Sequence, residues 1–186
     1  MQKKHIITMS GNIASGKGTV IELLKKSLNY GVYRNGAYAR SLCHNMGITI
    51  NEFQEYIKVH PEIDNQIEKS AREYAKNNDD LIIDARLGWY VVKESFKVYL
   101  SVNLDVAATR IMNDKRRLES ESYSTFEEAK KYISYRQDEE EKRFKNLYGI
   151  DINDMTNYDY VLDTTNLVPS KINELIMENY MKWLEE

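Results

Sequence analysis

One stretch decides the fold of this chain: Gly11-Asn12-Ile13-Ala14-Ser15-Gly16-Lys17-Gly18-Thr19. It follows an apolar run at 5–9 and opens a helical pattern at 17–28, which is the setting that a phosphate-binding loop requires. Glycines allow backbone conformations that other residues avoid, so successive N–H groups can surround a phosphate. Lys17 adds a positive charge for the outer phosphates, and the dipole of the next helix points there too. The alternative is an ordinary glycine-rich turn that carries a lysine, which the spacing disfavours.

Short apolar runs and longer amphipathic stretches alternate along the rest of the chain. We predict strands at 5–9, 81–83, 97–102 and 158–162, with a weaker one at 31–34. We predict helices at 17–28, 37–45, 52–58, 63–76, 105–115, 126–147 and 170–184. Strand followed by helix, repeated, predicts an α/β fold with a parallel sheet of about five strands flanked by helices. Two additions, at about 48–78 and 115–125, are expected over the ends of the sheet, where ligands bind in such folds.

Length and composition exclude several classes of protein. The chain has 186 residues and a net charge of −3, which fits a single domain over 1–186 and argues against a nucleic-acid surface. Cys43 is the only cysteine, so an internal disulfide and a cysteine zinc site are excluded and a reducing compartment is favoured. The sequence shows no signal peptide and no apolar stretch long enough to cross a bilayer. We expect a cytoplasmic protein without a membrane partner, and no pattern indicates its oligomeric state.

The residue after Lys17 narrows the class of phosphate-binding protein. The usual loop places Ser or Thr there, and its hydroxyl holds Mg²⁺. Here Gly18 takes that place and Thr19 follows. The order Gly-Lys-Gly-Thr resembles the nucleoside monophosphate kinases, in which the threonine lies near the phosphates and the metal is held largely through water. We therefore expect Thr19 to take part in binding Mg²⁺, the cofactor that accompanies ATP.

Charged residues follow the third predicted strand. Asp84 and Arg86 come directly after 81–83, so both emerge at the carboxyl edge of the sheet, where ligands bind. An ordinary charged loop is the alternative. After the second predicted strand, the segment 35–40 indicates by itself only a loop that leads into a helix.

The longest predicted helix carries charges on a face that begins apolar. Arg136, Glu140 and Arg143 follow one another at helical spacing. They share that face with the apolar residues Phe126, Ala129, Ile133 and Leu147. Charges on a packing face are costly unless they meet partners or line a cleft. A solvated face with Glu–Arg pairs inside the helix explains the pattern equally well.

At this point the chain resembles the cytidylate kinases over nearly its whole length. Besides the loop, four features carry the resemblance: Asn35-Gly-Ala-Tyr-Ala-Arg40, Asp84-Ala-Arg86, the Arg136, Glu140 and Arg143 arrangement, and Leu162-Asp-Thr164-Thr. The segments 60–64, 87–89 and 148–154 resemble the shorter branch of these kinases. Asn35 stands where a serine is usual, and Ala85 stands where glycine is usual.

The resemblance implies a P-loop NTPase-type fold with a small acceptor-binding helical insertion and a lid. It also implies phosphoryl transfer from ATP to a nucleoside monophosphate, with CMP or dCMP favoured. The implied catalytic residues are Lys17, Arg86 and Arg136. The implied ATP-binding residues are Gly11, Asn12, Ile13, Ala14, Ser15, Gly16, Lys17, Gly18, Thr19, Arg110 and Thr164. The implied acceptor-binding residues are Asn35, Arg40, Asp84, Arg86, Arg136, Glu140 and Arg143, and the lid arginines are Arg116 and Arg117.

Two alternatives to this function stay open. The same fold could phosphorylate a different acceptor, such as UMP or a non-nucleotide hydroxyl. The chain could also be a nucleotide-binding regulatory module without turnover, which the changes at Asn35 and Ala85 favour. Retention of Lys17, Arg86, Arg136 and Arg143 argues against that second alternative.

Overall fold

A five-stranded parallel sheet lies at the centre of the molecule, with the strand order β2-β3-β1-β4-β5. The computed structural model describes residues 4–114 and 123–186. The strands are β1 (Ile6–Gly11), β2 (Gly31–Arg34), β3 (Leu81–Asp84), β4 (Phe96–Ser101) and β5 (Tyr160–Asp163). All the predicted strands are confirmed, and the fold class is that of the sequence prediction.

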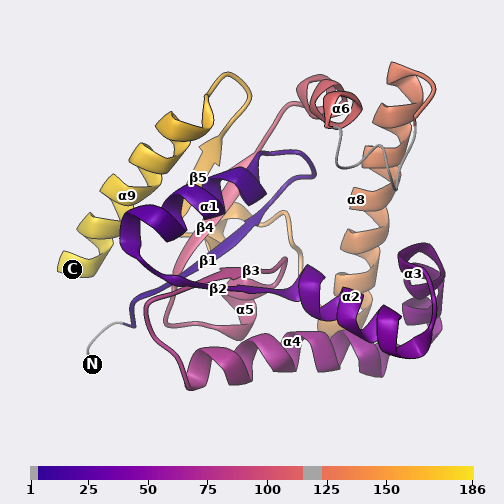
Figure 1. Cartoon of the computed structure of the whole chain (residues 1–186), viewed down its shortest axis with the longest axis horizontal. Coiled ribbons are helices and arrows are strands. Elements are labelled where there is room, and N and C mark those ends of the chain that lie inside the picture. Colours follow the sequence, from indigo (N-terminus) through magenta and orange to yellow (C-terminus); the bar gives the residue numbers. More distant parts are fainter. Residues whose placement is uncertain (1–3, 115–122) are drawn as a thin grey trace.

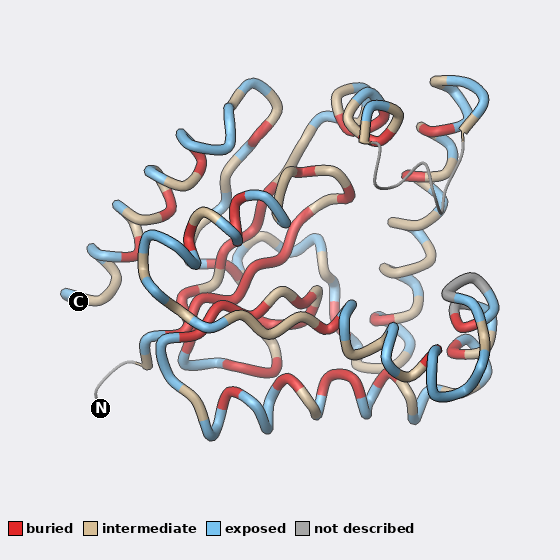
Figure 2. Tube along the Cα trace, in the orientation of Figure 1, coloured by how far each residue is buried: buried red, intermediate tan, exposed pale blue. Residues whose placement is uncertain are grey.

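Helices cover both faces of this sheet (Figure 1). On one face, Ile7 and Met9 of β1 join an apolar cluster with α1 (Lys17–Leu28) and α9 (Pro169–Glu185). On the other face, Ile6 joins a cluster that includes α4 (Pro61–Lys76) and α5 (Gly88–Val91). Alternate residues of a strand point to opposite faces, so β1 is buried along its whole length. Figure 2 shows the buried residues concentrated on the central strands.

Helix α4 packs on the sheet more closely than its sequence indicates. Ala71 and Ala75 are buried in the cluster that contains Ile6, because their small side chains allow the helix to approach the strands. The expectation that all of 48–78 lies over the ends of the sheet is therefore wrong for the second half of α4. The first turns of α4 pack instead with α2 (Asn35–Met46) and α3 (Ile50–Val59) in a separate apolar cluster.

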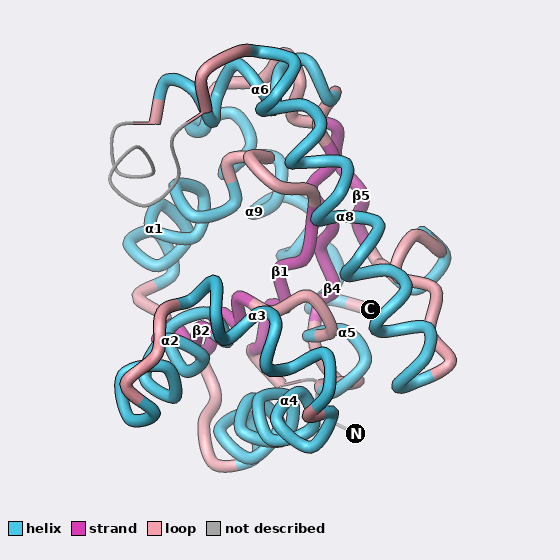
Figure 3. The backbone as a smooth tube through the Cα atoms, turned by 90° about the vertical axis from the view of Figure 1, so that its right-hand side faces the viewer, coloured by secondary structure: helices cyan, strands magenta, loops and turns pink. Residues whose placement is uncertain are grey.

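Helix α8 (Phe126–Tyr148) stands beyond the carboxyl ends of the strands and joins two parts of the molecule (Figures 1 and 3). Its N-terminal half packs on α6 (Leu104–Asn113) through Ala129 and Ile133. Its C-terminal half reaches α4 through the ion pair of Arg143 with Asp64, and Phe144 is buried beside Leu87, which follows β3. The short α5 and the 3₁₀ turn η1 (Met155–Asn157) were not predicted, because such short turns carry no detectable periodicity. Within 4–114 and 123–186, no helix combines the length and the apolar character needed to cross a membrane.

Candidate active site

The loop between β1 and α1 forms a wall of a cavity of about 500 Å³. Gly11 has a φ of 147°, and a Cβ atom there would approach the Leu100 carbonyl oxygen to 2.3 Å. Gly16, with a φ of 85°, ends the loop at the N-terminus of α1. Both positions require glycine, because one lies against backbone and both have left-handed φ values. The predicted ATP-binding residues 12–19 all line this cavity.

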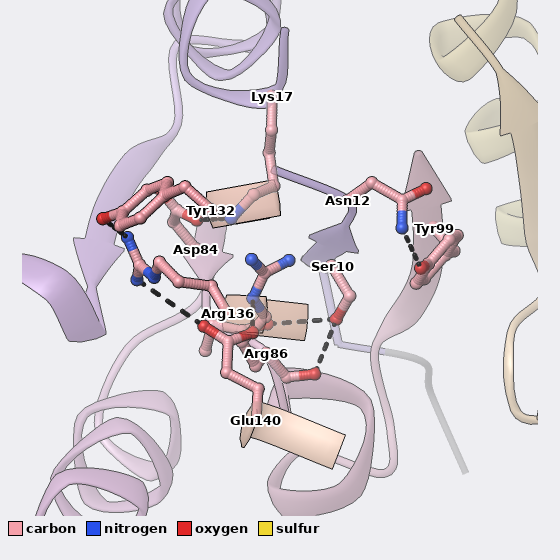
Figure 4. Close-up of polar contacts among 10 residues, drawn as sticks. Ser10, Asn12, Lys17, Asp84, Arg86, Tyr99, Tyr132, Arg136 and Glu140 are labelled. Carbon is pink, nitrogen blue, oxygen red and sulfur yellow. Dashed lines mark hydrogen bonds and ion pairs between the residues drawn. The ribbon is translucent and has the colours of Figure 1, made fainter. Parts of the chain in front are cut away.

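Lys17 forms an ion pair with Asp84 inside the cavity (Figure 4). The parallel register pairs Met9 of β1 with Asp84 of β3, so the ends of the two strands bring the residues together. Asp84 also accepts a hydrogen bond of 3.1 Å from Arg34. Burial lowers the pKa of Lys17, and the carboxylate beside it opposes that change. Burial alone would raise the pKa of Asp84, but the positive charges of Lys17 and Arg34 outweigh it and lower that pKa.

Glu140 connects two of the predicted arginines. Its Oε2 atom lies 2.9 Å from Nε of Arg86, and its Oε1 atom lies 3.8 Å from Nη2 of Arg136. Arg136 also donates a hydrogen bond of 3.2 Å to the Tyr132 hydroxyl (Figure 4). The pair between Arg136 and Glu140 lies within α8, as the solvated-face alternative expected. Glu140 also reaches Arg86 at the end of β3, so this face of the helix contacts the edge of the sheet as well.

A second cavity, of about 580 Å³, lies between α3 and α8. Its wall combines apolar and aromatic side chains with charged ones: Glu55, Ile57, Lys58, Pro61, Tyr132, Tyr135, Arg136, Glu139, Glu140, Lys142, Arg143, Asn146 and Leu147. Arg136 lines this cavity and the loop cavity alike. The two cavities therefore meet at its side chain.

Two predicted acceptor residues contact acidic side chains of α4. Nε of Arg143 lies 3.4 Å from Oδ2 of Asp64, and Nδ2 of Asn35 donates a hydrogen bond of 3.0 Å to Glu68. Burial raises the pKa of Asp64, with Arg143 acting against it. Burial and the nearby Asp64 carboxylate raise the pKa of Glu68 to about 7. The structure therefore places Asn35 and Arg143 beside buried carboxyl groups.

Arg110 ties the phosphate-binding loop to the segment after β5. Its guanidinium donates to the carbonyl oxygen of Ala14 at 3.1 Å and to that of Thr164 at 2.8 Å. The Thr164 hydroxyl donates to the carbonyl oxygen of Ser15 at 3.0 Å. Thr164 is buried, and Arg110 lines the loop cavity. The predicted ATP-binding residues from three segments are thus in contact.

The remaining predicted residues stand apart. Arg40 is exposed on α2 and does not line either cavity. Its expected contact with an acceptor phosphate therefore requires movement of this side chain toward the cavities. Arg116 and Arg117, expected in the lid at about 115–125, lie outside the described residues.

Sequence reasoning missed Arg34, Asp64 and Glu68. Arg34 ends β2 at the same edge as Asp84, so a search of every strand end would have found it. Asp64 and Glu68 continue the helical stripe of Ala71 and Ala75, the buried face of α4. Two carboxylates on the same helical face as the apolar residues were the signal that could have identified Asp64 and Glu68.

Comparison with known proteins identifies the family of this chain. A family model described as the cytidylate kinase-like family matches residues 6–166. This chain belongs to the cytidylate kinase-like family. A cytidylate kinase of Thermoplasma volcanium is 33% identical over 175 residues, covering 92% of this chain and 88% of the relative. Membership of this kinase family and the shared fold support the classification of this chain as a phosphotransferase.

The chain is also similar to a longer protein and to a solved structure. An S-adenosylmethionine-dependent nucleotide dehydratase of Lacinutrix mariniflava is 37% identical over 180 residues. That match covers 96% of this chain but only 36% of the relative, so the chain spans about a third of that protein's length. Shikimate kinase from Bacteroides thetaiotaomicron has a TM-score of 0.60 at 16% identity, covering 92% of this chain and 98% of that structure. This likeness shows the kinase fold.

Proposed function

We propose that this chain transfers a phosphoryl group from ATP to a nucleoside monophosphate, with CMP or dCMP as the favoured acceptor. One observation carries the proposal: Arg136 lines both the loop cavity and the cavity between α3 and α8. A guanidinium at such a junction suits a reaction in which a phosphoryl group passes from a ligand in one cavity to a ligand in the other.

The loop cavity is the proposed ATP site. Loop N–H groups and Lys17 would hold the outer phosphates, so that Lys17 exchanges the Asp84 carboxylate for phosphate oxygens. Leu167 and Pro169 line the same cavity and offer apolar surface to the adenine ring. Arg110 would hold this surface in position, because it donates hydrogen bonds to the backbone of the loop and of residue 164.

The transfer step asks the protein for alignment and positive charge. An oxygen of the acceptor phosphate attacks the γ-phosphorus, and the bond from that phosphorus to the β–γ bridging oxygen breaks. The products are ADP and a nucleoside diphosphate. The attacking oxygen is already anionic, so no general base is required. Arg86 and Arg136 would bind the oxygens that gain charge in the transition state, and Glu140 would hold both arginines in place.

Kinases of this fold typically use Mg²⁺, and the residues present fit it. Thr19 and Asp84 both line the loop cavity and offer a hydroxyl and a carboxylate oxygen. Mg²⁺ prefers a small number of protein oxygens together with substrate phosphates and water. Among the described residues, no group of three or more His, Cys, Asp and Glu side chains could hold a metal ion by itself. When bound, the ion would offset phosphate charge, and Thr19 and Asp84 are the residues that would hold it.

The choice of acceptor rests on the family and on named relatives. The family model and the Thermoplasma volcanium relative carry the name of cytidylate kinase, which favours CMP. The reaction in the name of the Lacinutrix mariniflava relative is not assigned to this chain, because the match spans only 36% of that protein. Other acceptors remain for the experiment to separate.

The first test is coupled ADP release with ATP and Mg²⁺ and each of CMP, dCMP, UMP, AMP and GMP. Arg136→Ala should lower turnover about a hundredfold or more, by analogy with the loss of other transition-state donors. Lys145→Ala is the matched control, because Lys145 is an exposed cation on the same helix. It should retain full turnover.

The outcomes separate the candidates. Fast turnover with CMP or dCMP that collapses only in Arg136→Ala supports the proposal. Turnover with a different acceptor retains the kinase and replaces its substrate. ATP binding measured by calorimetry, with no ADP formed from any acceptor, would establish a nucleotide-binding module instead.

A further inference from the structure

Asp84 lies between two positively charged side chains at the carboxyl edge of the sheet. Its Oδ1 atom pairs with Nζ of Lys17, and its Oδ2 atom accepts a hydrogen bond of 3.1 Å from Nη1 of Arg34. The strand register explains the second contact, because β2 and β3 pair Arg34 directly with Asp84. Each oxygen of the carboxylate therefore has a cation of its own.

Arg34 is also held from a second side. Its Nη2 atom forms an ion pair with Oε1 of Glu22 on α1. The planar guanidinium thus uses one nitrogen for each carboxylate, and this geometry fixes its orientation. Glu22 belongs to the helix that Lys17 begins, so Arg34 joins β2 to the helix that follows the phosphate-binding loop.

Arg34 stands outside the walls that a nucleotide would touch. In the described parts of the chain, Lys17 and Asp84 line the loop cavity, whereas Arg34 lines neither that cavity nor the one between α3 and α8. Any effect of Arg34 on a bound nucleotide therefore passes through Asp84 or through the long-range field of its charge.

The contact of Arg34 with Asp84 matters because Lys17 has to change partners. Lys17 holds Asp84 in the ligand-free protein, whereas it would bind the outer phosphates of ATP in the proposed function. Once Lys17 leaves, Asp84 is a largely buried carboxylate beside the phosphates, and an unpaired charge in such a site is costly. Burial alone would raise the pKa of Asp84, and Lys17 and Arg34 both lower it. After the exchange, Arg34 remains as the partner of the carboxylate.

We propose that Arg34 is a positioning residue that releases Lys17 for ATP by keeping the Asp84 carboxylate paired. The inference rests on the proposed function, because it concerns the ATP site of that reaction. Without Arg34, Asp84 would keep only Lys17 of these two cations and would hold it more strongly. ATP would then have to separate that pair and leave the bare carboxylate facing its phosphates. The affinity for ATP should therefore fall.

Four substitutions test this role. Arg34→Met keeps the length of the side chain and removes its charge, Arg34→Gln is a second neutral variant, and Arg34→Lys restores the charge. Lys25→Ala is the matched control, since Lys25 is an exposed cation on α1. Asp84→Asn provides a background in which the partner of Arg34 is already neutral.

The measurement is ATP binding by calorimetry in the presence of EDTA, so that Mg²⁺ does not contribute. We expect Arg34→Met and Arg34→Gln each to weaken ATP binding about tenfold, because the pair of Lys17 with Asp84 becomes harder to separate. Arg34→Lys should bind ATP more tightly than either neutral variant, and Lys25→Ala should match wild type. In the Asp84→Asn background, Arg34→Met should cost about twofold at most, since residues in direct contact couple in such cycles. Affinity for CMP should stay unchanged, and melting curves confirm that each variant folds.

Several results would overturn the inference. One is an unchanged affinity for ATP in the folded Arg34→Met and Arg34→Gln variants. Another is a loss of equal size in the Asp84→Asn background, because Arg34 would then act on the phosphates through its field and not through Asp84. An equal loss in Lys25→Ala would have the same meaning. Absence of ADP formation with every monophosphate overturns the proposed function instead, while ATP binding still decides the role of Arg34.

Discussion

The Nε atom of Arg86, just beyond β3, lies 2.9 Å from Oε2 of Glu140 on α8. This ion pair joins the edge of the sheet to the helix that packs on α6, and both of its residues are largely shielded from solvent. The second oxygen of Glu140 lies 3.8 Å from Arg136. One carboxylate therefore sets the positions of two guanidinium groups.

Glu140→Gln should weaken turnover through those arginines. The neutral amide keeps the shape but loses the charge that holds Arg86 and Arg136, so we expect kcat to fall about tenfold or more. Affinity for ATP should change less than kcat, because Glu140 contacts the loop cavity only through Arg86 and Arg136. Steady-state kinetics check this, with Glu127→Gln, an exposed position on the same helix, as the control.

A double-mutant cycle shows whether Glu140 acts through Arg86. If it does, adding Glu140→Gln to Arg86→Ala should cost much less than it costs alone, since residues in direct contact couple in such cycles. Full additivity of the two effects on kcat would contradict a positioning role.

Asp84→Asn should destabilise the ligand-free protein and do so less when ATP is bound. The change leaves Lys17 without its carboxylate partner, whereas Arg34 keeps its ion pair with Glu22. An uncompensated charge in a partly buried site is costly. ATP phosphates offer Lys17 another anion. Thermal unfolding without Mg²⁺, which Asp84 would help to hold, should show a deficit in Tm against wild type that shrinks with saturating ATP. An equal deficit with and without ATP would refute this exchange of partners.

Glu68→Gln should flatten the pH dependence of stability between pH 4.5 and 7. The folded-state pKa of Glu68 is raised from 4.5 to about 7, so the folded state holds its proton more tightly than the unfolded chain. Its contribution is therefore complete below the unfolded pKa and is lost as pH rises through the folded pKa. That loss is on the order of 3 kcal/mol. The groups that act on it are Asp64, Asn35, Arg143 and Arg72.

Urea denaturation at several pH values checks this prediction. The difference in unfolding free energy between Glu68→Gln and wild type should move in favour of the variant from pH 4.5 to 7. Glu73→Gln, which removes an exposed carboxylate, should track wild type without such a trend. A parallel course of wild type and Glu68→Gln would show that Glu68 titrates normally.

Arg110→Ala should lower ATP affinity about tenfold and leave nucleoside monophosphate affinity unchanged. The change removes hydrogen bonds to the carbonyl oxygens of Ala14 and Thr164, which hold two walls of the loop cavity together. Calorimetry measures both affinities, and amide exchange at 164–167 should quicken. Arg72→Ala, an exposed arginine on α4, provides the control. Equal losses for both nucleotides would point to a general structural effect instead.

The sheet could be predicted from sequence because most of its strands are short apolar runs followed by a recognisable loop or helix pattern. β1 precedes a glycine-rich loop, and α1 begins at the lysine of that loop, which fixes both boundaries. The placement of α4 could not be predicted in the same way. Its surface is mostly charged, and the two alanines that bring it onto the sheet carry little hydrophobic signal.

The sequence predicted that Asp84 and Arg86 emerge at the carboxyl edge of the sheet, but it did not predict the contact between Lys17 and Asp84. That contact follows from the register of the parallel strands, which brings the carboxyl ends of β1 and β3 together. Along α8 the sequence could not decide between a solvated face and a packed one, because Glu140 has partners both within the helix and outside it. Asp64 and Glu68 escaped notice because acidic residues on a helix are usually assigned to solvent.

Arg136 contributes one side chain to the walls of two cavities. A ligand that moves this guanidinium from one side therefore reshapes the other side as well. Thermodynamic reciprocity then requires each ligand to change the affinity of the other by the same factor, whichever arrives first. The free energy of binding both ligands follows from the affinity of each ligand alone and this coupling factor. The order in which the two ligands bind affects only the rate at which the doubly bound state forms.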